Sequence, residues 1–105
     1  MKHSTGTPTK AEAEWMHHVS ELGCIVCLNQ GHKTPCAVHH ILRGGIRMGH
    51  MYTIGLCDPG HHQNAGLQPG SGKISRHPNK ARFEAEYGTE LELLEQTREL
   101  LGVAA

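Results

Sequence analysis

The sequence has few of the residues that usually fill a hydrophobic core. Aromatic residues make up 4% of its 105 positions and hydrophobic residues 37%. No apolar run approaches the roughly 20 residues of a transmembrane helix, and the first ten residues, MKHSTGTPTK, contain no apolar stretch typical of a signal peptide. We therefore expect a cytoplasmic protein without a membrane partner. It should form one domain over residues 9–105, after a flexible N-terminus at 1–8, and should need an additional stabilising element.

An excess of positive charge is also absent. The chain has ten Lys and Arg, ten Asp and Glu, and a formal net charge of zero. This argues against a protein that binds nucleic acid through a general basic surface. A bound divalent cation could still supply positive charge locally, and the basic residues are concentrated in the middle of the chain, whereas residues 84–99 are acidic.

Metal-binding residues, in contrast, are abundant, with four cysteines and ten histidines. Cytoplasmic thiols stay reduced, so zinc ligation is favoured over disulfides. Two close pairs, Cys24-x2-Cys27 and Cys57-x3-His61, lie about thirty residues apart, and each can form a turn that contributes two ligands to a closed tetrahedral Zn2+ site. Redox proteins also use C-x-x-C, but within a βαβ unit that this sequence lacks. The remaining Cys36 is either a small buried hydrophobe or a replacement for one of these four ligands.

The first half of the chain predicts one helix and a hairpin. Thr9 and Glu12 form a capping-box pattern, apolar residues recur at helical spacing through Leu22, and Gly23 ends the helix. Residues 37–41 and 51–56 are predicted as two strands that pair across a loop of about ten residues, interrupted at Arg43-Gly44-Gly45. A stretch rich in Gly, Pro, Ser and Asn then follows to Gly72.

The second half predicts two more helices. One runs from Pro78, in its first turn, to Tyr87, with Phe83 facing inward and Gly88 ending it. The other begins with the capping box of Thr89 and Glu92 and continues to Gly102. Its apolar positions are Leu91, Leu94, Leu100 and Leu101.

Two pairs of adjacent histidines indicate a second site. On a strand, His39 and His40 point to opposite faces, so only one of them can meet a metal squarely and the other needs a different role. Adjacent side chains seldom chelate one tetrahedral ion together, so His61 and His62 are also expected to serve different sites. We interpret four other histidines as surface residues. They are His3, His17, His18 and His32.

These segments resemble the His-Asn-His (HNH, ββα-metal) nuclease superfamily. The resemblance rests on GCIVC, VHHI, the Gly-Gly turn, residues 50–57, His61-His62 and residues 77–90. It is closest to the phage recombination enhancement, or RecA-dependent nuclease, family and covers roughly residues 9–101. It implies an α+β fold with a small ββα-metal core and a zinc knuckle, flanked by an N-terminal helix and C-terminal helices. The implied activity is metal-dependent endonucleolytic hydrolysis of DNA, in a phage or prophage protein that acts with RecA filaments in recombination.

The resemblance also assigns roles to individual histidines. It makes His40 the general base, a role that suits an imidazole with an ordinary pKa of about 6.5. It makes His39 and His62 ligands of a catalytic metal, Mg2+ or Mn2+ or another divalent transition metal. His50 takes the place of the central asparagine, where it either positions the base or the adjacent loop or is merely structural.

The sequence departs from the family pattern after His62. Many relatives have a second helical ligand four residues later, where this chain has Gly66. We therefore assign the third ligand to His77, before the first C-terminal helix, where the family branch also has a histidine.

Two alternatives from other classes compete with a nuclease. A non-catalytic zinc module that binds DNA or protein would explain the cysteines without needing His40. A zinc hydrolase is disfavoured, because the chain lacks an H-E-x-x-H helix and is expected to have no carboxylate beside the histidines to act as base. The basic residues near the histidines are either phosphate contacts or an ordinary solvated face; they are Arg43, Arg47, Lys73 and Arg76.

Overall fold

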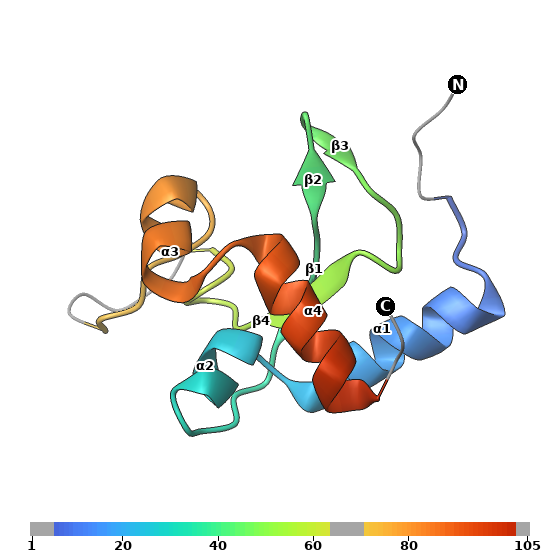
Figure 1. Ribbon diagram of the computed structural model, residues 1–105, viewed down its shortest axis with the longest axis horizontal. Coiled ribbons are helices and arrows are strands. Elements are labelled where there is room, and N and C mark those ends of the chain that lie inside the picture. The colour runs from blue at the N-terminus through green and yellow to red at the C-terminus, as the bar shows by residue number, and fades with distance from the viewer. Residues whose placement is uncertain (1–5, 64–70, 103–105) are drawn as a thin grey trace.

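The computed structural model, which describes residues 6–63 and 71–102, has an α+β architecture of helices and two small antiparallel sheets (Figure 1). This confirms the α+β class. His3 and Gly66 lie outside the described residues, as do most of the predicted flexible N-terminus and part of the predicted loop that ends at Gly72. The elements in chain order are α1 (Lys10–Leu22), α2 (Ile25–Asn29), β1 (Ala37–His40), β2 (Leu42–Arg43), β3 (Ile46–Arg47), β4 (Thr53–Leu56), α3 (Lys80–Tyr87) and α4 (Glu90–Leu101).

The two longest helices begin at capping boxes, as the sequence predicts. The Thr9 side chain accepts the backbone N–H of Glu12, and the Glu12 side chain accepts the backbone N–H of Thr9. Thr89 and Glu92 form the same reciprocal pair at the start of α4. Each box satisfies N–H groups that a helix start leaves without partners.

The central sheet pairs β1 with β4 in antiparallel register, which confirms the predicted hairpin. His39 lies opposite Ile54, and His40 opposite Thr53. The connection between β1 and β4 is not a simple loop, because β2 and β3 form a second hairpin around Gly44 and Gly45. Figure 1 shows this hairpin projecting beyond the sheet.

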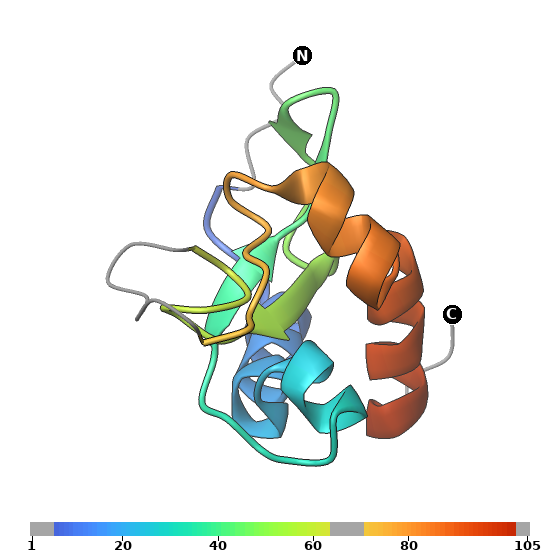
Figure 2. The ribbon, with the colours of Figure 1, turned by 90° about the vertical axis from the view of Figure 1, so that its left-hand side faces the viewer.

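Helices pack around β4 to form the core. All four residues of β4 are buried, and α1, α2 and α4 all contact this strand (Figure 2). Trp15 of α1 lies in this core, and its Nε1–H donates to Thr53 Oγ1 at 2.9 Å. Gly55 permits a close approach, since a Cβ there would overlap the Gly23 carbonyl oxygen and lie 2.7 Å from Cys36 Sγ. In the part of the chain that the structure describes, no helix is long and apolar enough to cross a bilayer.

The structure adds to or departs from the sequence analysis in three places. The segment after Cys24 forms the short helix α2, with the Cys24 side chain accepting the backbone N–H of Cys27 at its start. Helix α3 begins at Lys80 rather than at Pro78, which precedes it. Among the apolar positions that the sequence shows on α4, Leu94 is buried but Leu91 and Leu100 are more than half exposed. The buried residues of α4 are Glu90, Leu93, Leu94 and Thr97.

Candidate functional site

Three cysteines and one histidine converge on one buried point. The Sγ atoms of Cys24, Cys27 and Cys57 lie 3.4, 3.5 and 3.3 Å from Nδ1 of His61, and those of Cys27 and Cys57 are 3.9 Å apart. Zinc bonds of about 2.3 Å to sulfur and about 2.0 Å to nitrogen, at tetrahedral angles, place the ligand atoms roughly 3.5–3.8 Å apart. This buried Cys3His group therefore has the donors and spacing to hold a metal such as zinc.

The surroundings of the Cys3His group favour a thiolate at Cys57 but a protonated thiol at Cys24. Lys73 Nζ donates to Cys57 Sγ at 3.3 Å, and the backbone N–H of His61 donates to the same sulfur at 3.4 Å. Burial opposes ionisation of Cys57, but these hydrogen bonds lower its pKa below the usual value. Burial instead raises the pKa of Cys24 to about 12, so this thiol needs a cation in place of its proton to act as a ligand. Tyr87 packs edge-on against the His61 ring, with centroids 4.9 Å apart.

The structure brings a second group together from His39, His62 and His77. Their ring centroids lie 5.1 to 5.6 Å apart, and one nitrogen from each ring lies within 4.8 Å of the others. Burial lowers the pKa of both His62 and His77, and the neighbouring His39 lowers it further. Neutral imidazoles offer the lone pair that a metal requires. The three rings could therefore hold a second cation.

Two chain segments that run side by side position His62 and His77. The backbone N–H of Arg76 donates to the His61 carbonyl at 2.7 Å, and that of His77 donates to the His62 carbonyl at 3.0 Å. Gln63 and His77 form a parallel bridge in the same region. The adjacent His61 and His62 consequently contribute to different groups, one to the Cys3His group and the other to the three-histidine group.

The three-histidine group opens into a small cleft beside His40. The cleft has a volume of about 240 Å³. Within it, His40 lies on the sheet beside His39, and Arg47 comes from the β2–β3 hairpin. The residues that line it are Val38, His39, His40, Leu42, Arg47, His62 and His77.

A hydrogen-bond chain determines which nitrogen of His40 carries a lone pair. His50 Nε2 lies 3.0 Å from the Gly6 carbonyl oxygen, which can only accept, so Nε2 carries the proton. In neutral His50, Nδ1 must then accept, and its partner at 3.1 Å is His40 Nε2. His40 therefore donates from Nε2 and keeps its lone pair on Nδ1 when neutral. Burial, assisted by Arg47 and His50, lowers the pKa of His40 to about 4, which leaves it neutral near pH 7.

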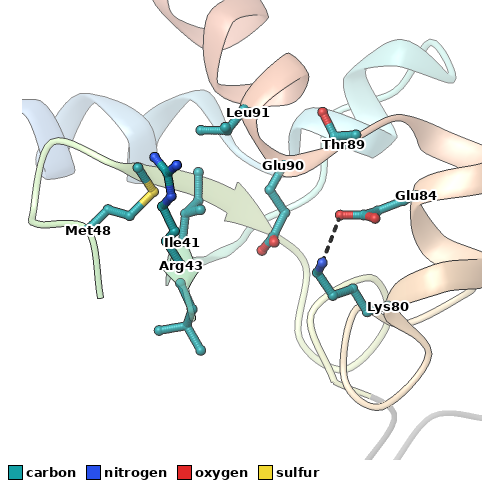
Figure 3. Close-up of a pocket in the computed structure, with 9 residues that line it drawn as sticks. Ile41, Arg43, Met48, Lys80, Glu84, Thr89, Glu90 and Leu91 are labelled. Atoms are coloured by element: carbon teal, nitrogen blue, oxygen red, sulfur yellow. Dashed lines mark ion pairs between the residues drawn. The ribbon is translucent and has the colours of Figure 1, made fainter. Parts of the chain in front are cut away.

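Two carboxylates lie beside these histidines, although the sequence analysis expected none there. Asp58 Oδ2 lies 3.5 Å from Nδ1 of His62. Glu90, the first residue of α4, is 4% exposed, and its Oε2 accepts a hydrogen bond from His39 Nε2. Arg76 Nε lies 3.1 Å from the same oxygen as a charge partner, although without hydrogen-bond geometry. Figure 3 shows Glu90 reaching from α4 toward a pocket that Ile41 and Lys80 also line. No local signal identifies Glu90, because it lies 51 positions from His39 in sequence.

The other residues that the sequence singled out are not members of either group. Cys36 Sγ donates weakly to the Val19 and Ser20 carbonyls, each at 3.7 Å, and the Cys3His group does not include it. Arg76 is buried against Glu90, which makes the surface role considered for it wrong. The three described histidines interpreted as surface residues are exposed, namely His17, His18 and His32.

Comparison with known proteins identifies a family. The family model described as "Recombination enhancement, RecA-dependent nuclease" matches residues 8–102, a range that contains both candidate metal-binding groups and the His40–His50 pair. A search of curated proteins finds no match.

Proposed function

The chain belongs to the recombination enhancement family of RecA-dependent nucleases, and on that premise we propose that it is a metal-dependent DNA endonuclease of the HNH (ββα-metal) type. One observation carries the proposal. Three imidazoles able to hold a cation share a single cleft with His40, a fourth imidazole that has a hydrogen-bonded partner. Hydrolysis of a phosphodiester needs both a cation and a base, because charge must be stabilised on the phosphate while the attacking water loses a proton.

In this proposal His39, His62 and His77 hold the catalytic metal. When bound, a divalent cation supplies a Lewis acid for the scissile phosphate and the leaving 3′ oxygen. Three nitrogen donors suit Mn2+ or another divalent transition metal better than Mg2+, which prefers oxygen ligands. The Cys3His group holds Zn2+ and keeps β4 attached to α2.

His40 is the general base in this proposal. Its Nδ1 takes the proton from the attacking water, while its Nε2–H continues to donate to His50. His50 thus positions the base through its own hydrogen bond to the Gly6 carbonyl. A base that stays neutral near pH 7 is available in most molecules, and positioned proton transfer typically contributes about 10²–10⁴-fold to a rate.

The proposed substrate is DNA, coated or accompanied by a RecA-type recombinase filament. The family description supplies the recombinase context. Arg43 and Arg47 lie exposed on the β2–β3 hairpin next to the cleft, where they are available to bind the phosphate backbone. The zero net charge of the chain gives little general attraction to DNA. A recombinase filament that presents the DNA would compensate for this weak attraction.

The test compares wild-type protein with His40→Ala on plasmid, single-stranded and recombinase-coated DNA, with Mn2+ or Mg2+ added. We expect the substitution to lower the cleavage rate by about 10²–10⁴-fold while zinc content and the circular dichroism spectrum stay unchanged. His18→Ala, a change at an exposed histidine of α1, is the matched control and should cleave at the wild-type rate. Wild-type cleavage by His40→Ala would remove His40 as the base.

The second candidate function is a zinc-binding module that contacts DNA or protein without cutting. The observation that favours it is the Cys3His group, which is complete without His40. Absence of cleavage on every substrate and with every metal, together with one tightly bound zinc per chain, would support this function instead.

A further inference from the structure

A buried carboxylate links the three-histidine group to the rest of the fold. The Glu90 side chain is 5% exposed and the His39 side chain 3%, so their hydrogen bond is shielded from water. Arg76, 9% exposed at its side chain, places its Nε 3.1 Å from the same carboxylate oxygen. A buried charge is costly unless it is compensated, which points to a specific role for this arrangement.

We propose that Glu90 is a positioning residue for the metal ligand His39, an inference that rests on the proposed nuclease function. A carboxylate only accepts hydrogen bonds, so His39 donates to it from Nε2. A neutral imidazole protonated at Nε2 has its lone pair on Nδ1. Glu90 therefore selects the tautomer in which Nδ1 of His39 binds the cation, and it fixes the rotation of the ring.

The position of Glu90 in the fold supports this role. His39 lies on β1, Glu90 is the first residue of α4, and Arg76 precedes the third candidate ligand, His77. The same carboxylate oxygen contacts the strand and the segment that carry two of the three histidines. Its own backbone is fixed by the capping box at Thr89. Glu90 thereby sets the separation of the ligands as well as the orientation of one ring.

The charges of this arrangement also favour a positioning role. Arg76 and Glu90 together are neutral, so the carboxylate does not need to be a metal ligand to be tolerated in the interior. His39 then acts as the link between carboxylate and metal, an arrangement in which loss of the carboxylate commonly weakens metal binding or activity about 10–100-fold.

The test uses zinc-loaded full-length protein and three variants. Glu90→Gln keeps an oxygen that can accept from His39, whereas Glu90→Leu removes the acceptor. Glu84→Gln is the matched control, because Glu84 lines the same pocket but pairs with Lys80, at 3.4 Å (Figure 3). The readouts are the affinity for added Mn2+, measured by electron paramagnetic resonance, and the His39 tautomer, measured by long-range proton–nitrogen NMR.

We expect Glu90→Leu to weaken Mn2+ binding by about 10–100-fold and to lose the dominant Nε2–H tautomer of His39. Glu90→Gln should retain that tautomer and lose less than about tenfold in affinity, and Glu84→Gln should match wild type. If Glu90→Leu fails to fold because Arg76 is left unpaired, the double variant Arg76→Leu/Glu90→Leu removes both charges and gives the same comparison.

Wild-type Mn2+ affinity and an unchanged His39 tautomer in folded Glu90→Leu, or in the double variant, would overturn the inference. So would absence of Mn2+ binding to the wild-type histidine group. These outcomes do not depend on cleavage. A wild-type protein that binds Mn2+ through Glu90-positioned His39 but cuts no DNA would reject the proposed function and support the positioning role.

Discussion

Replacing one cysteine of the Cys3His group tests whether a metal holds this fold together. In Cys27→Ser the hydroxyl is a poor substitute for a thiolate, so we expect zinc to be lost. Three of the ligands, Cys24, Cys27 and Cys57, are at most 2% exposed and belong to the core cluster itself. Without the metal, the core would contain a buried thiol with a raised pKa and a buried imidazole without their shared partner.

The expected loss of stability is large. A domain of this size has a free energy of unfolding of about 5–15 kcal/mol, and structural zinc in small domains contributes about 10–16 kcal/mol of apparent binding free energy. We expect Cys27→Ser to lower the free energy of unfolding by more than about 4 kcal/mol, a size typical of losing a metal. At about 4–8 °C per kcal/mol, Tm should fall by more than about 15 °C.

The assay measures zinc stoichiometry by elemental analysis and thermal unfolding by circular dichroism. Cys36→Ser is the matched control, because the same atom is changed at a half-buried cysteine outside the group. Among the described residues its thiol makes weak hydrogen bonds to two carbonyls at 3.7 Å, so Tm should change by no more than about 8 °C, which corresponds to about 1 kcal/mol. A Cys27→Ser protein with one bound zinc and a wild-type Tm would refute the reasoning, as would zinc loss in Cys36→Ser.

Two further substitutions test the packing and the proposed DNA contact. Gly55→Ala places a methyl group against the Gly23 carbonyl and 2.7 Å from Cys36 Sγ, and should destabilise the protein by about 1–3 kcal/mol in chemical denaturation; an unchanged midpoint would contradict the close approach. Arg47→Ala should weaken DNA binding and reduce the slope of log affinity against log salt by about 1. Lys10→Ala, a change at the exposed start of α1, should leave that slope unaltered, and equal slopes in both variants would argue against a phosphate contact at Arg47.

Local signals in the sequence predicted much of the secondary structure. The capping boxes at Thr9 and Thr89 identify helix starts because a side chain and a backbone N–H three residues apart satisfy each other without any tertiary contact. The turn at Gly44 and Gly45 carried a comparable signal for the β2–β3 hairpin, since both glycines have positive φ. Strands of two residues each are too short for hydrophobic periodicity to reveal them.

Tertiary contacts decided what sequence could not predict. The buried face of α4 includes Glu90 because a carboxylate that contacts His39 and Arg76 is accepted in the interior, and this turns Leu91 toward solvent. Hydrophobicity alone would predict a buried Leu91 and an exposed Glu90. Likewise, the hydrogen bond from His50 to the Gly6 carbonyl joins residues 44 positions apart, so no local pattern predicts it.

A single peptide bond separates the two candidate metal-binding groups, since His61 and His62 are neighbours in the chain. If both proposed ions are present, oxidation of the thiolates that expels zinc frees His61 and displaces the imidazole of His62 beside it. Under the proposed function, one oxidation event would then both destabilise the fold and stop DNA cleavage.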